Sequence, residues 1–262
     1  MFILKHISQI QSIDQKIIPG RTNSVSVLRE DQIHPFVSGN KFRKLKYTLQ
    51  DAKDQGTHAL LTFGGAYSNH IAAVADAGFQ MGFTTIGVIR GEELTAKVHT
   101  NPTLRFAQER GMKLHFVSRA TYKQKESDHF IDSLRDRFGN FYLIPEGGAG
   151  PLAVKGCEEI LGPETSQFDV ICVSVGTGGT IAGIINASES HQTIIGFSAL
   201  KGTFQHSEIK KYSAKTNYEL TDDYCFGGYG KIDSTLVRFI NEFKENTGIP
   251  LDPVYTGKLM YG

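Results

Sequence analysis

A lysine that follows a tight turn is the first candidate for covalent chemistry in this sequence. The segment SGNKFRKLKY, residues 38–47, places Lys41 directly after a Gly-Asn pair and follows it with more basic residues. Most lysines are solvated, and a helix can expose the basic cluster that runs from Lys41 to Lys46. A lysine whose amine loses its proton through burial or a neighbouring cation instead attacks an aldehyde. The segment is therefore either a solvated helix face or a site of covalent bonding.

The loop FGGAYSNH, residues 63–70, is a second candidate site, between an apolar run and a helical pattern. Its two glycines allow a ligand to approach the backbone closely. Ser68 and Asn69 fall at the expected start of the helix, where free N–H groups favour an anion, although an ordinary helix cap uses the same residues. Ser68 and His70 also suggest a serine hydrolase, but the loop lacks the G-x-S-x-G pattern and no motif places an acidic partner.

A glycine-rich segment, SVGTGGTIAG at residues 174–183, is the third candidate. A buried type of strand runs into it, and its backbone N–H groups with two threonine hydroxyls suit a phosphate. It matches neither common nucleotide motif, because the third glycine of G-x-G-x-x-G falls on Ile181 and no G-K-[ST] follows. What remains is either a tight turn without a ligand or a compact anion-binding loop, made of Gly176, Thr177, Gly178, Gly179 and Thr180.

Two tyrosines beside glycines complete the set of candidates. Tyr229 lies in FGGYGK, residues 226–231, and Tyr255 lies in LDPVYTGK, residues 251–258. Both could transfer protons or border a pocket, and packing is the alternative role for each.

The elements that must position these loops alternate along nearly the whole chain. The predicted strands are residues 25–31, 58–64, 84–90, 113–118, 141–145, 169–176 and 193–200. The predicted helices are residues 42–56, 68–78, 101–111 and 154–162, each ending at a glycine. This alternation predicts an α/β fold with mainly parallel sheets and flanking helices, in which ligands bind beyond the carboxyl ends of the strands. The least regular part, residues 201–231, is either a lid or specificity segment or a surface excursion.

Composition excludes several classes of protein. The 262 residues include 28 basic and 27 acidic side chains, so no overall field attracts nucleic acid or a membrane surface. No run of about 18 apolar residues and no signal peptide is present, which favours a soluble chain without a membrane anchor. The three cysteines (157, 172 and 225) form no C-x-x-C pair, so we expect no metal site, no disulfide framework and a reduced, cytoplasmic setting.

Taken together, in this order and at these intervals, the four segments resemble a family of enzymes that depend on pyridoxal 5′-phosphate (PLP). This family comprises the 1-aminocyclopropane-1-carboxylate (ACC) deaminases and D-cysteine desulfhydrases, of the tryptophan synthase β-like type (fold type II). The resemblance runs from about Asn23 to the C-terminus and implies a two-lobed fold with the cofactor between the lobes. Residues 1–43 plus 150–262 would form the larger, PLP-binding domain, and residues 44–149 a smaller inserted α/β domain. Enzymes of this fold type are commonly homodimers.

The resemblance also implies how the cofactor is held. Lys41 would form the Schiff base with PLP, and Lys44 would lie near the phosphate. Asn69 would contact the hydroxyl of the cofactor ring, and the loop from Gly176 to Thr180 would bind the phosphate. An amine that traps an aldehyde and a loop that holds phosphate agree with this cofactor on physical grounds.

On the substrate side, the resemblance implies a small amino acid. Ser68 would face the substrate carboxylate and help to move protons, while Tyr229 and Tyr255 would line the substrate side. Lys41, once released as an amine, would be the general base. The products would be a 2-oxo acid and ammonia, with sulfide when the substrate is cysteine.

Three departures from the family bear on the activity. ACC deaminases have an acidic residue after the tyrosine aligned with Tyr255, where this chain has Thr256, and they have a glutamine before the serine of the first loop, which reads AYSNH here. Both departures favour D-cysteine desulfhydrase over ACC deaminase, which stays the alternative. The chain ends at LDPVYTGKLMYG, without the His-Thr-Gly-Gly segment whose threonine bonds the pyridine nitrogen in the family, so we expect one cofactor contact to be lacking.

Two readings from other classes stay open. A PLP-binding protein without catalysis would keep the cofactor loops but turn over no substrate. A nucleotide-binding α/β protein would use the same glycine loop for a ribonucleotide phosphate. Against the second reading, no acidic residue follows at the interval of about 20 residues that a dinucleotide fold requires, since position 196 is glycine and Glu189 comes too early.

Overall fold

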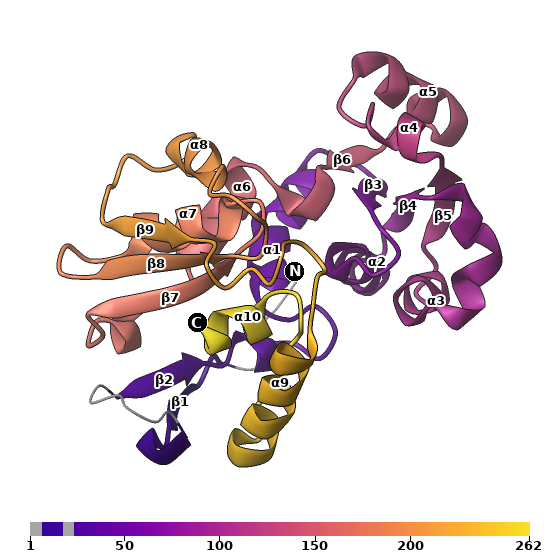
Figure 1. The fold of residues 1–262 in the computed structure, drawn as a ribbon. Helices are drawn as coiled ribbons and strands as arrows, with labels where there is room; N and C mark the ends of the chain where they lie inside the picture. Colours follow the sequence, from indigo (N-terminus) through magenta and orange to yellow (C-terminus); the bar gives the residue numbers. More distant parts are fainter. Residues whose placement is uncertain (1–6, 18–23) are drawn as a thin grey trace. The chain divides into compact units, whose positions relative to one another are not determined.

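A computed structural model describes residues 7–17 and 24–262 of the chain, as two compact units (Figure 1). One unit contains Glu30–Gly156, and the other contains Ser8–Arg29 together with Cys157–Gly262. Each unit has its own parallel sheet with flanking helices, which confirms the predicted fold class. The predicted inserted domain, residues 44–149, falls within the first unit, which also includes residues 30–43 with Lys41. The predicted functional domains, residues 1–43 plus 150–262 and residues 44–149, therefore stay a prediction.

The first unit is built on a sheet of four parallel strands in the order β5-β4-β3-β6. Leu61 in the centre of the sheet is in register with Ile86 on one side and Leu143 on the other. Parallel strands require crossover segments, which here are helices and cover both faces of the sheet. The strands are β3 (Ala59–Gly64), β4 (Thr84–Arg90), β5 (Lys113–Val117) and β6 (Tyr142–Ile144). The helices are α1 (Asn40–Asp54), α2 (Asn69–Met81), α3 (Pro102–Glu109), α4 (Arg119–Tyr122) and α5 (Asp128–Phe138). A further helix, α6 (Pro151–Glu158), begins in this unit, and its last two residues belong to the second.

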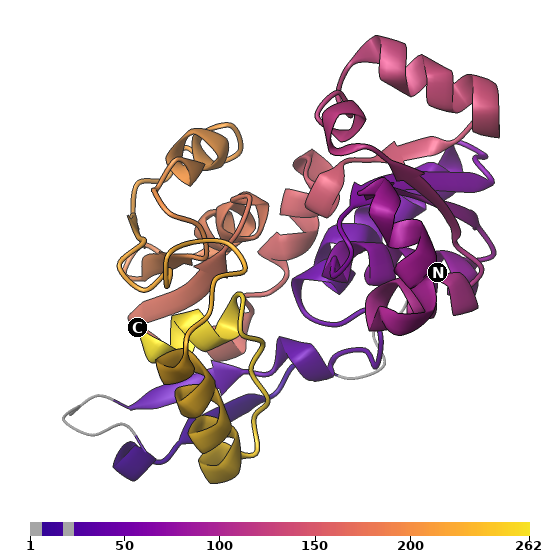
Figure 2. The same cartoon turned by 45° about the vertical axis from the view of Figure 1, so that its right-hand side comes forward.

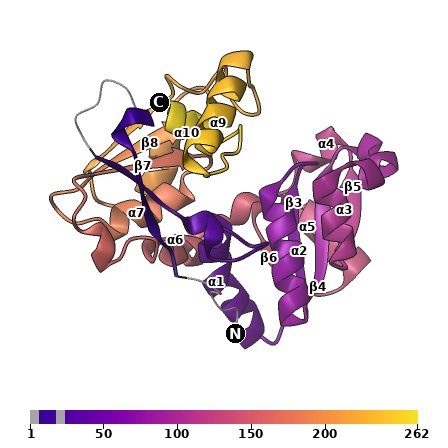
Figure 3. The same ribbon diagram turned by 90° about the horizontal axis from the view of Figure 1, so that it is seen from below.

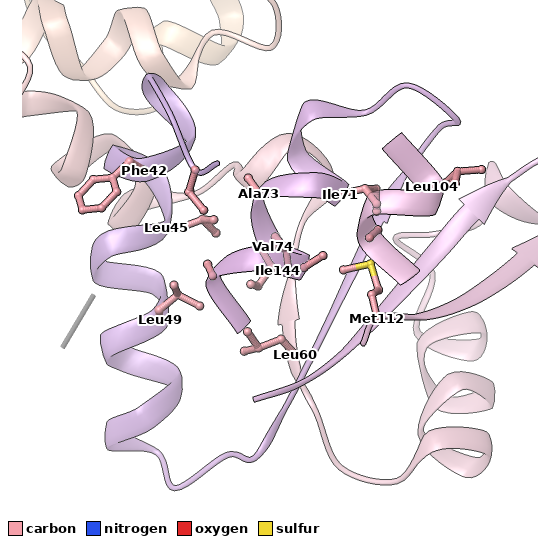
Figure 4. Packing of buried hydrophobic residues seen from close by; sticks show 14 of the residues in the cluster. Phe42, Leu45, Leu49, Leu60, Ile71, Ala73, Val74, Leu104, Met112 and Ile144 are labelled. Carbon is pink, nitrogen blue, oxygen red and sulfur yellow. The ribbon is translucent and has the colours of Figure 1, made fainter. Parts of the chain in front are cut away.

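Alternate side chains of the strands enter two separate cores of this unit, because successive strand residues point to opposite faces. Leu60 and Ile89 pack with α1, α2 and α3, whereas Leu61 and Val88 pack with α4 and α5. Figure 3 shows α2 and α3 beside the strands of this sheet. Figure 4 shows the first core, where Leu45 of α1 points towards the sheet. The helix that carries Lys41 is therefore fixed by its apolar side.

The helix boundaries follow the expected capping chemistry with two exceptions. Asn101 caps α3 through Leu104 N, and Pro102 is the first helical residue, as predicted. The predicted end of α2 at Gly78 is wrong: the helix continues to Met81 and ends at Gly82, the residue with the left-handed φ of 76°. Gly78 lies inside the helix, and a glycine is needed there because a Cβ would lie 2.1 Å from the side chain of Thr85. The predicted end of α6 at Gly162 is also wrong, since the helix ends at Glu158.

The second unit combines a parallel sheet with an antiparallel ribbon. The sheet has the order β7-β8-β9, and β1 pairs with β2 in the ribbon. The strands are β1 (Ile10–Ile13), β2 (Val25–Leu28), β7 (Val170–Val175), β8 (Thr193–Ser198) and β9 (Tyr218–Thr221). The helices are α7 (Gly179–Ala187), α8 (Gln205–Lys210), α9 (Ser234–Thr247) and α10 (Thr256–Tyr261). Figure 2 shows α10, in yellow, beside α9.

All seven predicted strands are present, with ends shifted by up to three residues. Several elements had no counterpart among the predictions, notably β1, β9, α5 and α9. The irregular segment 201–231 contains α8 and β9, which adds a third strand to the parallel sheet. Short 3-10 helices lie at Gln15–Ile17, Glu30–Gln32, Glu92–Thr100, Glu146–Gly148 and Pro163–Thr165. Among the described residues, no helix has the length and apolar character that crossing a bilayer requires.

Candidate active site

In the first unit, two lysine side chains of α1 converge on one backbone carbonyl. Lys41 and Lys44 are three residues apart and so share a helix face. Their Nζ atoms donate to the carbonyl oxygen of Gly147, at 3.3 Å and 3.2 Å. Gly147 lies in the turn that follows β6, at the carboxyl end of a parallel strand. The structure thus brings both predicted lysines together at the edge of the sheet where ligands bind in α/β folds.

The basic cluster from Lys41 to Lys46 is not a solvated helix face, and this alternative is wrong. Arg43 and Lys44 are only 6% and 3% exposed. The Arg43 guanidinium donates from Nε and Nη2 to the two carboxylate oxygens of Glu30, at 2.9 Å and 2.8 Å. Buried charges need a partner, and Glu30 and the Gly147 carbonyl supply it here.

His70 lies beneath the same turn and stays uncharged. The Thr62 hydroxyl donates to the carbonyl of Ile144, so it accepts from Nε2 of His70, 2.9 Å away. Burial, together with the positive charges of Lys41 and Lys44, holds the pKa of His70 well below its usual value. The neutral ring therefore supports the turn without adding a third positive charge beside the lysines.

Ser68 and Asn69 occupy the start of α2, as predicted. Ser68 is the N-cap, and its Oγ accepts from the backbone N–H of Ile71 at 3.3 Å. Asn69 is exposed and is the first helical residue after β3. A Cβ on Gly64 would lie 2.4 Å from Ile71 and 2.8 Å from Ser68 Oγ, so this glycine is required by packing. The ordinary cap is thus present, and it holds Ser68 at the carboxyl end of a central strand.

In the second unit, the glycine-rich loop between β7 and α7 forms an open cradle. The N-cap of α7 is Gly178, with a φ of 98°, and it has no side chain to accept from the first N–H groups of the helix. A Cβ on Gly176 would lie 3.2 Å from the Tyr255 ring, and one on Gly178 would lie 3.2 Å from Glu208. The loop is therefore packed from behind by larger residues, while its N–H groups suit an anion.

The two tyrosines of the fourth candidate pair meet in the same unit. The rings of Tyr229 and Tyr255 are 6.1 Å apart and inclined at 66°, an edge-to-face contact. Tyr229 is 56% exposed. Because Tyr255 also packs on Gly176, the structure places the Tyr255 ring beside the glycine loop, with Tyr229 against it.

Several residues that build these sites had not been singled out from the sequence. Gly147 accepts from both lysines, and the glycine pair that follows a strand in IPEGGAG was the available signal. Gln205 is fully buried and donates from Nε2 to the Gly176 carbonyl at 3.2 Å and to Ser198 Oγ at 2.8 Å. Nothing in the sequence marked Gln205, because it belongs to the segment with the weakest pattern.

Comparison with known proteins assigns the class of protein that the fold and the sites indicate. The chain matches the family described as pyridoxal-phosphate dependent enzyme over residues 18–262, and it belongs to that family. This confirms the predicted family and cofactor, and with them an enzyme of this class.

Within this family, the chain is similar to proteins named ACC deaminase and D-cysteine desulfhydrase. A solved structure of an ACC deaminase homologue has a TM-score of 0.85 and 28% identity, over 99% of this chain and 84% of that one. The bifunctional D-cysteine desulfhydrase/ACC deaminase of Arabidopsis thaliana, a mitochondrial protein, is 29% identical over 94% of this chain and 68% of its own length. The D-cysteine desulfhydrase of Salmonella paratyphi A is 24% identical, with 93% and 80% covered.

The residues present fit PLP in each unit taken by itself. Lys41 supplies a primary amine for the aldehyde, with the second cation of Lys44 on the same carbonyl. At the start of α7, Gly178 has a φ of 98° and no side chain that caps the helix, which suits an anion such as a phosphate. The first unit thus contains an amine that suits the aldehyde of PLP, and the second contains a loop that suits its phosphate.

Proposed function

We propose that this chain is a PLP-dependent lyase that acts on D-cysteine. The reaction adds water and breaks the carbon–sulfur and carbon–nitrogen bonds, so that D-cysteine and water give pyruvate, ammonia and hydrogen sulfide. The observation that carries the proposal is the convergence of Lys41 and Lys44 on Gly147, which puts a reactive amine at a strand end. The family and the relatives named above support the same class of reaction.

Lys41 is the residue proposed to take the proton from the substrate. When bound, PLP supplies an electron sink for the charge that develops on the substrate carbon. Lys41 would hold the cofactor through its amine, and the same amine would accept that proton as the general base. Lys44 and the loop Gly176–Thr180 are proposed to bind the phosphate, and Asn69 the ring hydroxyl.

Ser68, Tyr229 and Tyr255 are the residues proposed to meet the substrate. The Ser68 hydroxyl lies at the start of α2, where N–H groups favour a carboxylate. Tyr229 and Tyr255 present phenol hydroxyls that can exchange protons with the leaving group. A small amino acid fits best if both rings stay close to the loop, which the packing of Tyr255 on Gly176 and of Tyr229 on Tyr255 supports.

The surroundings of Thr256 favour D-cysteine over ACC. The Thr256 hydroxyl donates to the carboxylate of Asp252 at 2.7 Å, and the same carboxylate accepts from the N–H groups of Val254, Tyr255 and Thr256. An acidic residue at position 256, as ACC deaminases have, would place a second negative charge against Asp252. ACC deamination, which gives 2-oxobutanoate and ammonia, is the second candidate because the Arabidopsis relative carries both names.

A direct assay decides among these functions. The PLP-loaded protein is incubated separately with D-cysteine, L-cysteine and ACC, and sulfide, ammonia and the 2-oxo acid are measured. The proposal expects sulfide and pyruvate in equal amounts from D-cysteine, with at least a tenfold preference over ACC. Activity on ACC alone would replace the proposal with the second candidate. Bound PLP without turnover of any of the three would identify a non-catalytic binding protein.

We further propose a homodimer in the cytoplasm, with residues 44–149 as the smaller functional domain. Enzymes of this fold type commonly pair, and light scattering after gel filtration would measure the mass directly. Cys172 lies exposed on β7, and an exposed thiol suits a reducing compartment. A monomer at micromolar concentration, or an oxidised Cys172 in protein taken from cells, would contradict these statements.

A further inference from the structure

The second unit contains a buried lysine with no place in the proposed reaction. Lys258 lies in α10 and is 2% exposed. Its Nζ donates to the carbonyls of Cys225 and Gly228, each at 2.7 Å, and more weakly to that of Ala199 at 3.4 Å. The two short distances are typical of bonds from a charged donor.

A buried cation of this kind is unusual because each of its hydrogen bonds goes to a backbone carbonyl rather than to a carboxylate. Burial lowers the pKa of Lys258, while Cys225 and Asp252 act in the opposite direction. Removing an ammonium group from water is unfavourable, so a lysine is stable at this position only if all of its N–H donors are used. An ammonium has three N–H donors and no acceptor, which matches three converging carbonyl oxygens. Carbonyl oxygens arranged in this way are also the ligands that bind small monovalent cations in proteins.

The three carbonyls belong to segments that the ammonium joins. Ala199 directly follows β8, and Cys225 and Gly228 lie in the turn before α9. That turn is conformationally demanding, since Phe226 has a φ of 52° and Gly227 and Gly228 also have positive values. A turn of this kind persists only where its surroundings hold it.

The same turn and the same helix carry the two tyrosines. Tyr229 directly follows Gly228, whose carbonyl accepts from the Lys258 ammonium, and Tyr255 is the residue before α10. Their rings touch edge to face. Loss of the ammonium would remove the link between Ala199 and this turn, and it would leave the carbonyls of Cys225 and Gly228 only their bonds from the backbone N–H groups of Gly228 and Lys231. The turn that holds Tyr229 would then lose its tie to the rest of the unit.

We propose that Lys258 is a tethered monovalent cation, whose ammonium holds the carbonyls of Ala199, Cys225 and Gly228 and thereby positions Tyr229 against Tyr255. It is a positioning residue, since it reaches the tyrosines only through the backbone. We call the Lys258 ammonium and these three carbonyls the cage. The expected effect on substrate turnover rests on the proposed function, whereas the cage itself does not.

Restoring the cation from solution tests the cage. Lys258→Ala removes both the ammonium and the stem, and leaves room for propylammonium. We expect the melting midpoint to fall by roughly 10 °C, because the three carbonyls lose the charged donor that joins them and the packing of the stem is lost. Propylammonium should restore more than half of the loss, and tetramethylammonium, which has no N–H donor, should restore none at equal ionic strength. The control Lys231→Ala, an exposed lysine just after the same turn, should change neither value.

Equal recovery with both salts, or no difference between the two variants, would overturn the cage. If Lys258→Ala does not fold, an NMR measurement on the wild-type protein still tests the cage. With ¹⁵N-labelled lysine, the Lys258 ammonium should give a slowly exchanging signal at low temperature, with through-space contacts to Gly228. The lack of any protected lysine ammonium would equally contradict the proposal.

A kinetic measurement separates the cage from the proposed reaction. With D-cysteine as substrate, Lys258→Ala should lower kcat/KM about 100-fold, as expected for a displacement of about 1 Å in a reacting group. Propylammonium should recover this loss in parallel with the melting midpoint. If the midpoint recovers but the rate does not, the positioning of the tyrosines is wrong. If the wild-type protein has no activity, the proposed function fails while the thermal test of the cage still stands.

Discussion

The substitution Gly156→Ala tests how the first unit positions Lys41. Gly156 lies in α6, and a Cβ at this position would stand 1.9 Å from the carbonyl oxygen of Arg43 in α1. An ordinary contact is about 3.5 Å, so the two helices would have to separate by about 1.6 Å. The core side chains Leu45 and Leu49 of α1 are completely buried, so this helix cannot retreat without disturbing the packing.

Two opposing effects set the magnitude for Gly156→Ala. Alanine favours the helix by about 0.5–1 kcal/mol, whereas overpacking costs about 1–3 kcal/mol. The net loss of about 1–2 kcal/mol should lower the melting midpoint by roughly 2–8 °C. Lys41 is two residues from the point of contact, and a displacement of about 1 Å should reduce Lys41-dependent turnover about 100-fold.

Thermal denaturation and the sulfide assay measure the two effects of Gly156→Ala. The control is Pro151→Ala, an exposed position at the start of the same helix, which should change both values little. A Gly156→Ala protein that melts at or above the wild-type temperature and keeps full turnover would refute the reasoning. That result would mean that the position of α1 does not depend on its contact with Gly156 of α6.

Three further predictions concern pH and the phosphate loop. The pKa of His70 is lowered in the folded protein, so the free energy of unfolding should fall as pH decreases below about 6.5, and His70→Gln should reduce that dependence. Burial and the bond to Asp51 raise the pKa of Tyr142 to about 12, so Tyr142→Phe should leave the tyrosinate absorbance at pH 11 nearly unchanged. Gly178→Ala forces a side chain onto a φ of 98° against Glu208, and should weaken PLP binding at least tenfold in a fluorescence titration.

A control measurement isolates the cause of the effect in each of these three predictions. His115 also has a lowered pKa, from burial and Arg137, so only the difference between wild type and His70→Gln is informative; identical acid profiles would contradict the prediction. Asp51→Asn should let Tyr142 ionise at lower pH, and no such change would exclude Asp51 as a cause. Gly202→Ala has a similar φ of 90° with more space, so equal loss of PLP binding in both glycine variants would attribute the effect to strain alone.

Much of the fold could be predicted because its parallel strands are continuous apolar runs. Strands such as Thr84–Arg90 are buried on both faces, and a run of this kind is visible without knowledge of its neighbours. The β9 strand, Tyr218–Thr221, has a mixed pattern, and only pairing with β8 makes it a strand. The sequence predicts a helix end at Gly78, because a glycine needed for close packing looks the same in sequence as one needed for a left-handed turn.

The site could be predicted as four segments but not as a network of contacts. Lys41 and the glycine loop follow turns or strands, and such local patterns are readable in sequence. The carbonyl of Gly147 lies 106 residues from Lys41 in the sequence, and the carbonyls that accept from Lys258 lie 30 to 59 residues from it. Contacts between distant backbone atoms leave no periodic signal, so a buried lysine such as Lys258 looks like any solvated one.

The central claim is that Lys41 bonds PLP, and a visible absorption spectrum before and after borohydride tests it most directly. The protein, loaded with PLP, is reduced, digested and mapped by tandem mass spectrometry, which separates Lys41 from Lys44. We predict a visible band that disappears on reduction, and a pyridoxyl group on Lys41 that is missing in Lys41→Ala. A modification on another lysine, or a colourless protein that stays unmodified after PLP is added, would contradict the account.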